Sequence, residues 1–269
     1  MSELIITSPA NARLKSLVAL RRRRAREDAG LTLIEGYDEL SLALDAGIVP
    51  RTLYHCPELM LDASVQQDVV RRVQALGSDT QQLGRAAFEK VAYREGPDGF
   101  LAVVDSVVRS CADLSVGPAP LILVCQGVEK PGNLGAMLRT ADAAGVEAVV
   151  AVDPVTDWSN PNLVRASKGT VFSVPVASAG SDEALTWLSE NGIAIAATTP
   201  DTDLYYTDVD YAGPMAIAVG AEKLGLSEEI LAAAAYRIRI PMVGRANSLN
   251  VAASAAVVIY EAVRQRRGR

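Results

Sequence analysis

The residues best suited to chemistry in this 269-residue chain lie in three segments that each follow an apolar run. The first segment spans 126–140, the second 220–226 and the third 240–251. Ligands of open α/β sheets bind outside the carboxyl ends of the strands, so these segments are where we expect a site. Their polar members combine amide, guanidinium, carboxylate and hydroxyl groups: Asn133, Arg139, Glu222, Ser248 and Asn250.

A single histidine restricts the chemistry further. His55 stands between Leu53-Tyr54 and Cys56-Pro57, a setting typical of a structural residue at a strand end. The sequence therefore disfavours HExxH metalloproteases and enzymes with a Ser-His-Asp or Cys-His catalytic site. The three cysteines are widely spaced and form no CxxC pair, so we expect neither a disulfide framework nor a metal site.

The glycines at 132 and 135 allow one alternative, a nucleotide-binding turn at the start of a helix. The GxGxxG spacing is absent, no P-loop lysine follows, and Asp153 precedes a proline. These departures disfavour a dinucleotide-dependent oxidoreductase. A purely structural alternative makes Asn133 the N-cap of that helix.

The charge is unevenly distributed along the chain. The net charge is −6, from 26 basic and 32 acidic residues, yet residues 1–26 hold seven basic side chains against Glu3 alone. Local basic clusters attract polyphosphates, although a solvated helix face is an equal alternative for the run of four arginines. The basic residues of the two terminal segments are Arg13, Lys15, Arg21, Arg22, Arg23, Arg24, Arg26, Arg264, Arg266, Arg267 and Arg269.

The first part of the chain reads as a compact α/β module of about 105 residues. Its expected helices are 9–29, 37–46 and 64–76, and its expected strands 32–34, 52–54 and 99–104. Residues 110–120 are small, polar and proline-containing, as in an interdomain linker. The pattern predicts one domain at 1–107, a linker at 108–118 and a second domain at 119–269.

From residue 121 onward, apolar β-branched runs recur at helix-length intervals, which indicates a parallel sheet flanked by helices. No apolar run approaches the length of a membrane span and no signal peptide is apparent, so we expect a cytoplasmic protein. The expected strands are 121–124, 148–152, 193–197, 216–219 and 237–240, with helices at 135–144, 182–190, 227–235 and 250–265.

Taken together, the three segments resemble the signature of the SpoU-like RNA 2′-O-ribose methyltransferases of the SPOUT superfamily, in particular the thiostrepton-resistance-type ribosomal RNA enzymes. Asn133-Leu134-Gly135 with Arg139 matches the first motif of the family, and Val219-Gly220-Ala221-Glu222 matches the second. Ile240-Pro241-Met242 with Ser248-Leu249-Asn250-Val251 matches the third. The resemblance covers nearly the whole chain. Ser8 to Arg13 and Glu35-Gly36 are similar to the L30e-like substrate-binding domain that these enzymes often carry.

The resemblance implies a fold and a reaction. The implied fold is an L30e-like α/β domain followed in the chain by a catalytic domain with a trefoil-knotted parallel sheet. The resemblance also implies a homodimer. The reaction is methyl transfer from S-adenosyl-L-methionine to a ribose 2′-hydroxyl of RNA, most simply 23S ribosomal RNA, without a metal. Carried over residue by residue, the catalytic group is Arg139, Asn133, Glu222, Ser248 and Asn250, and the cofactor is held largely by main chain at Thr198, Val219, Gly220, Ile240 and Leu249.

RNA contacts are expected at Arg21, Arg22, Arg23 and Arg24, and at Arg165 and Lys168, where a plain basic turn is the alternative. Each of the catalytic residues has a structural alternative when it is considered alone. Glu222 would be a carboxylate at a helix start, Ser248 and Asn250 would be helix caps, and Arg139 would be a solvated helix residue. Their ordered combination favours an enzyme over the remaining alternative, a non-catalytic RNA-binding or ribosome-assembly protein on the same scaffold. The sequence does not identify the target nucleotide, nor does it distinguish ribosomal RNA from transfer RNA as the substrate.

Overall fold

A computed structural model describes residues 5–107 and 109–267. The chain divides into two compact units, each considered by itself. One unit contains the described residues up to Val107 together with Asp157–Ser173, and the other contains Arg109 to Thr156 and the residues from Val174 onward. No helix in the described ranges is both long and apolar enough to cross a membrane.

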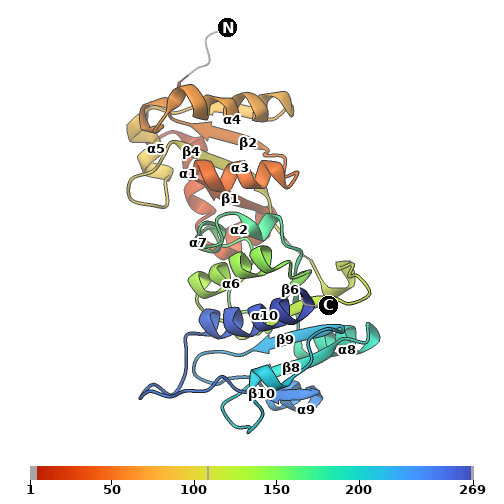
Figure 1. The fold of residues 1–269 in the computed structure, drawn as a ribbon. Coiled ribbons are helices and arrows are strands. Elements are labelled where there is room, and N and C mark those ends of the chain that lie inside the picture. Colours follow the sequence, from red (N-terminus) through yellow and green to blue (C-terminus); the bar gives the residue numbers. More distant parts are fainter. Residues whose placement is uncertain (1–4, 108, 268–269) are drawn as a thin grey trace. The chain divides into compact units, whose positions relative to one another are not determined.

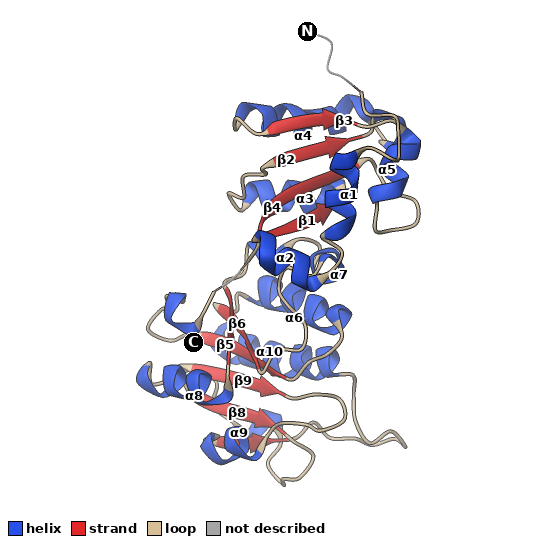
Figure 2. Ribbon diagram, turned by 180° about the vertical axis from the view of Figure 1, so that it is seen from behind, coloured by secondary structure: helices blue, strands red, loops and turns tan. Residues whose placement is uncertain are grey.

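The first unit is built on a mixed four-stranded sheet in the order β1-β4-β2-β3 (Figure 1 and Figure 2). β4 pairs antiparallel with β1 and β2, while β3 pairs parallel with β2. Five of the six β4 residues are buried, which places this strand at the centre of the hydrophobic core. The strands are β1 (Leu31–Glu35), β2 (Thr52–His55), β3 (Asp79–Gln82) and β4 (Phe100–Asp105).

Where the sequence predicts one helix over 9–29, the structure has two. The break falls at Arg22, whose backbone is extended with φ −90° and ψ 133°. β3 was not predicted, because its Asp-Thr-Gln-Gln sequence lacks an apolar side and it lies at the edge of the sheet. The helices of this unit are α1 (Ala12–Ala19), α2 (Arg23–Ala29), α3 (Tyr37–Asp45), α4 (Ala63–Ala75), α5 (Arg85–Val91) and α7 (Pro161–Ala166).

The segment 157–173, which contains α7, packs in the first unit although it lies within the sequence range 119–269. Arg26, only 3% exposed, forms an ion pair with Asp157 at 2.7 Å. Gly169 has φ +83°, and a Cβ there would lie 2.8 Å from the carbonyl oxygen of Glu39. Glycine is therefore required for this close approach to α3.

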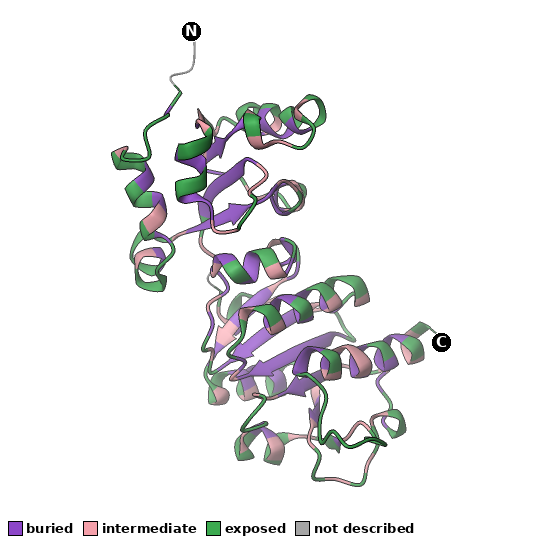
Figure 3. Ribbon diagram, turned by 90° about the vertical axis from the view of Figure 1, so that its left-hand side faces the viewer, coloured by how far each residue is buried: buried purple, intermediate pink, exposed green. Residues whose placement is uncertain are grey.

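The second unit contains a six-stranded parallel sheet in the order β10-β8-β9-β5-β6-β7 (Figure 2). This confirms the predicted parallel-sheet α/β fold. Every residue of β5, β6 and β9 is buried, as expected for strands covered on both faces (Figure 3). The strands are β5 (Leu121–Gln126), β6 (Ala148–Val152), β7 (Val176–Ala179), β8 (Ala194–Thr198), β9 (Met215–Val219) and β10 (Tyr236–Ile238).

Two pairs of helices cover this sheet. α6 (Pro131–Ala144) and α10 (Val251–Arg267) lie side by side on one face (Figure 1). α8 (Ser181–Glu190) and α9 (Glu228–Ala233) pack together and contribute Trp187, Leu188 and Ile230 to the core beneath the strands. The three segments singled out in the sequence connect β5 to α6, β9 to α9 and β10 to α10.

Candidate active site

The turn after β9 is shaped by a glycine. Gly225, with φ +69°, folds back so that its N–H donates to the carbonyl of Ala221 at 2.9 Å. A Cβ on Gly220 would lie 2.1 Å from the carbonyl carbon of Gly225, a distance that real Cβ atoms do not adopt. The turn can close only over a residue without a side chain, and Glu222 lies within this turn.

Three of the residues singled out in the sequence form one hydrogen-bonded network. The Asn133 side-chain nitrogen donates to Glu222 Oε1 at 2.6 Å, and the Asn250 side-chain nitrogen donates to Asn133 Oδ1 at 3.2 Å. Asn250 Oδ1 in turn accepts the N–H of Ala252 at the start of α10. The network therefore joins the turn after β9 to the first turns of α6 and α10.

Lys130 completes this network. Its Nζ lies 2.6 Å from Glu222 Oε2, so each oxygen of the Glu222 carboxylate accepts one hydrogen bond. These bonds, led by the one from Lys130, lower the pKa of Glu222 below its ordinary value of 4.5. Glu222 is therefore an anion at neutral pH.

The structure corrects the proposed cap at Asn133. The N-cap of α6 is Lys130, Pro131 follows it in the first turn, and Asn133 lies inside the helix that was expected to begin at 135. Proline suits this first position because its missing N–H would be unpaired there anyway. The side chain of Asn133 is left to bind Glu222.

Arg139 lies farther along α6 and is exposed. Within the described residues its guanidinium makes no hydrogen bond or ion pair, so the structure does not join it to Glu222. Arg139 lies six positions after Asn133, which rotates the two side chains to different faces of α6. Its five N–H donors are therefore free for a ligand.

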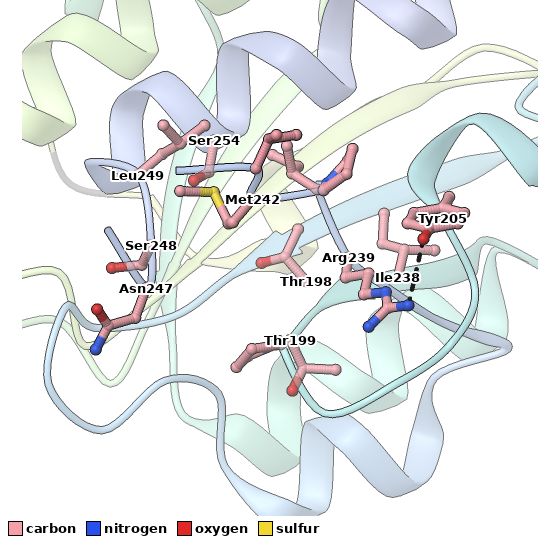
Figure 4. Close-up of a pocket in the computed structure, with 14 residues that line it drawn as sticks. Thr198, Thr199, Tyr205, Ile238, Arg239, Met242, Asn247, Ser248, Leu249 and Ser254 are labelled. Atoms are coloured by element: carbon pink, nitrogen blue, oxygen red, sulfur yellow. Dashed lines mark hydrogen bonds between the residues drawn. The ribbon is translucent and has the colours of Figure 1, made fainter. Parts of the chain in front are cut away.

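A pocket of about 520 Å³ opens at the carboxyl ends of β8 and β10 (Figure 4). It includes three of the five residues carried over for the cofactor, Thr198, Ile240 and Leu249, and one of the catalytic group, Ser248. Val219 and Gly220 are not part of its lining. Ser248 and Leu249 lie across the pocket from Tyr205 and Arg239 (Figure 4).

The main chain of this pocket suits a polar nucleoside. From Ile240 to Leu249 the backbone makes no hydrogen bond with another described part of the chain. The unpaired N–H and C=O groups can form hydrogen bonds with a ligand, and apolar side chains such as Met242 can pack against its rings. No group of three potential metal ligands occurs in the described ranges.

The arginine run does not act as a single face. Arg21 donates to the carbonyls of Lys90, Val91 and Ala92 at the end of α5, the last at 2.6 Å, and lies 5.0 Å from the ring centroid of Tyr93. Its guanidinium therefore caps a helix. All four arginines of the run, Arg22 included, are exposed. Arg23 pairs with Glu27 at 2.7 Å, and Arg24 lies 3.8 Å from Asp28.

The remaining basic residues also divide. Arg165 is exposed on α7, and Lys168 lies 3.8 Å from the buried carboxylate of Glu39. At the other end of the chain, Arg266 donates to four backbone carbonyls, among them Ala119 at 2.7 Å, and so has a structural role. Arg269 lies outside the described residues.

Sequence reasoning missed Lys130, Tyr205 and Arg239. Lys130 could have been found from its position, because it lies three residues before Asn133 in the first segment. Arg239 immediately precedes the Ile-Pro-Met motif, and its guanidinium carbon lies 4.9 Å from the centroid of the Tyr205 ring, but no pattern in the sequence pairs the two residues. That pairing depends on a loop that returns beside β10.

The fold and the site are those of a class of RNA-modifying enzymes that the sequence also matches. Residues 120–260 match the SpoU rRNA methylase family, and residues 11–102 match the MRM3-like substrate binding domain. The chain belongs to the SpoU rRNA methylase family, as its three motifs predicted.

Particular relatives match over most of their length. The 23S rRNA (uridine(2479)-2′-O)-methyltransferase of Streptomyces viridochromogenes is 31% identical, over 95% of this chain and 91% of the relative. The 23S rRNA (guanosine(2553)-2′-O)-methyltransferase RlmP of Bacillus subtilis is 29% identical, over 95% and 97%. The crystal structure of AviRb from Streptomyces viridochromogenes in complex with AdoMet superposes with a TM-score of 0.86 at 29% identity, covering 96% of this chain and all of that one.

Proposed function

We propose that this protein transfers a methyl group from S-adenosyl-L-methionine to a ribose 2′-hydroxyl of 23S ribosomal RNA. Membership of the SpoU family and the named activities of both relatives support this reaction, and the AdoMet complex of AviRb supports the cofactor. One observation carries the proposal: Leu249, which lines the pocket, and Asn250, which belongs to the network with Glu222, are consecutive residues. A cofactor pocket and a polar reaction site would thus adjoin.

Each polar group would have a defined task. S-adenosylmethionine supplies a methyl group activated by its sulfonium sulfur. The chain has to hold the 2′ oxygen in line behind that methyl carbon and provide for loss of the hydroxyl proton. A guanidinium stays protonated and is a poor base, so Arg139 would clamp the target phosphate and hydroxyl while the phosphate takes the proton.

The carboxylate network would position the reacting groups. Glu222 is held by Lys130 and Asn133, and Asn250 links Asn133 to α10. Ser248 would complete the polar wall from the pocket side. Positioning of this kind depends on side chains that are themselves fixed by hydrogen bonds.

The rest of the proposal concerns assembly and location. Residues 1–107 would bind RNA through exposed arginines of the 21–24 run, with Arg165 and Lys168 as further contacts, and 108–118 would link them to a catalytic domain at 119–269. The catalytic domain would carry a trefoil knot and form a homodimer in the cytoplasm. An intact motif set and the pocket support catalysis over the non-catalytic alternative.

The direct experiment maps ribose methylation across cellular RNA with and without this protein. We expect one or a few 2′-O-methylated positions of 23S rRNA to disappear in its absence and to return when purified protein and S-adenosylmethionine are added to unmodified RNA. Unchanged methylation of all ribosomal RNA, with loss of a transfer RNA site instead, would contradict the proposed substrate. No change in any RNA would contradict the reaction.

A further inference from the structure

Arg239 lies in the pocket wall in an arrangement that the motifs do not account for. Its guanidinium carbon is 4.9 Å from the centroid of the Tyr205 ring, and Nη2 is 3.4 Å from the hydroxyl of Tyr205 (Figure 4). The face of a tyrosine ring attracts a guanidinium and keeps its plane in one orientation. Arg239 is therefore a preoriented cation.

The backbone holds both partners in register. Arg239 N–H donates to the carbonyl of Leu204, and Tyr206 N–H donates to the carbonyl of Arg239, both at 3.0 Å. These bonds form a parallel bridge between Tyr205 and Arg239 beyond the end of β10. The loop that carries Tyr205 is thus fixed beside the pocket.

Most of the hydrogen-bonding capacity of Arg239 is unused. The nearest carboxylate, Asp203, is 3.6 Å away and its side chain is fully exposed to solvent, so this ion pair is weak. The Nε–H of Arg239 is buried and has no hydrogen-bond partner. Nη1 makes no hydrogen bond with a described residue either, so the guanidinium has donors left for a bound anionic oxygen.

Arg239 is also the one charged side chain among the described residues that line this pocket. S-adenosylmethionine carries a carboxylate on its amino-acid part, and a guanidinium binds a carboxylate through two parallel hydrogen bonds. We propose that Arg239, oriented by Tyr205, binds the carboxylate of the amino-acid part of S-adenosylmethionine. This assignment rests on the proposed function, because it takes the pocket as the cofactor site.

Two ligands separate this role from a purely structural one. S-adenosylhomocysteine contains the amino-acid part, whereas 5′-methylthioadenosine keeps the adenosine and the sulfur and lacks the carboxylate. Calorimetric titration of Arg239→Gln should show binding of S-adenosylhomocysteine weakened about 10- to 100-fold, the worth of a charged hydrogen-bonded pair. Binding of 5′-methylthioadenosine should change less than about threefold.

The control is Arg237→Gln, two residues earlier in β10. Arg237 donates from Nε to the carbonyl of Leu231 and does not line the pocket. It should leave both affinities unchanged. Equal weakening of both ligands by Arg239→Gln would make Arg239 only a support for the loop and overturn the proposal, as would no weakening of either. Failure of the wild-type protein to bind either nucleoside would instead overturn the pocket as the cofactor site.

Discussion

The Asn133 side chain donates to Glu222 at 2.6 Å across 89 residues of sequence. This bond connects the first turn of α6 to the turn after β9, two segments at the carboxyl edge of one parallel sheet. Because Lys130 binds the second oxygen of the same carboxylate, Glu222 has one defined position. Its position follows from these two hydrogen bonds.

Substitution of Arg139 should abolish methyl transfer without harm to the fold. Arg139 is exposed and pairs with no described residue, so Arg139→Ala should change the free energy of unfolding by less than about 0.5 kcal/mol. Single-turnover methylation of substrate RNA at saturating cofactor should fall at least about 100-fold. Arg139→Lys should also lose methyl transfer, because an ammonium group lacks the planar pair of N–H donors of a guanidinium. Near wild-type turnover by the alanine variant would remove Arg139 from the catalytic group.

Substitution of Glu222 should separate catalysis from cofactor binding. Glu222→Gln places an amide N–H2 against the donors of Lys130 and Asn133, so we expect kcat to fall about 10- to 100-fold. Affinity for S-adenosylhomocysteine should stay within about threefold, because Glu222 does not line the pocket. Lys223→Gln, in the same turn, is the matched control. A large loss of cofactor affinity with unchanged kcat would contradict this division.

The ionised Glu222 should also contribute a pH-dependent part of the stability. Its pKa in the folded state lies below the ordinary 4.5, so the contribution is present above pH 4.5 and is lost as the pH falls through the folded value. The difference in melting temperature between wild type and Glu222→Gln should be constant near neutral pH and shrink in acid. A difference that grows as the pH falls would reverse the sign of the assigned pKa shift.

Gly220→Ala should destabilise the protein through a backbone clash. The new Cβ would meet the main chain of Gly225 and Leu226, so the turn would have to move, at a cost of about 1–3 kcal/mol. Gly132→Ala is the control, because a Cβ there meets nothing within 4 Å and alanine favours the first turn of α6. Urea unfolding measures both free energies. Equal stability of the two variants would show that the turn tolerates a side chain.

The arginine run should divide into a structural and an RNA-binding part. Arg21→Ala removes the cap of α5 and should lower the free energy of unfolding by about 1–2 kcal/mol. Arg22→Ala should leave stability unchanged and weaken RNA binding, with the slope of log K against log salt reduced by about 0.7–0.9. Filter binding at several salt concentrations measures this slope. An unaltered slope would make Arg22 part of a solvated helix face.

The sequence by itself determined which residue types stand at the carboxyl ends of the buried strands. Apolar runs such as 121–124 and 216–219 identify β5 and β9, because a strand covered on both faces must be apolar throughout. The segments after these two runs and after the expected strand 237–240 contain Asn133, Glu222 and Asn250 in an order sufficient to identify the family. These properties are local, so a single sequence reveals them.

Only the tertiary structure decided which of these groups meet. Lys130 and Asn133 share Glu222 because the parallel pairing of β5 with β9 brings their following loops to one edge. The same folding places the Arg239 guanidinium beside the Tyr205 ring and makes Arg21 a cap of α5, whereas Arg139 forms no hydrogen bond or ion pair with a described residue. Hydrogen bonds and ion pairs between distant residues require the two groups to be placed to within a few tenths of an ångström, and that placement arises only when the sheet and its helices are packed.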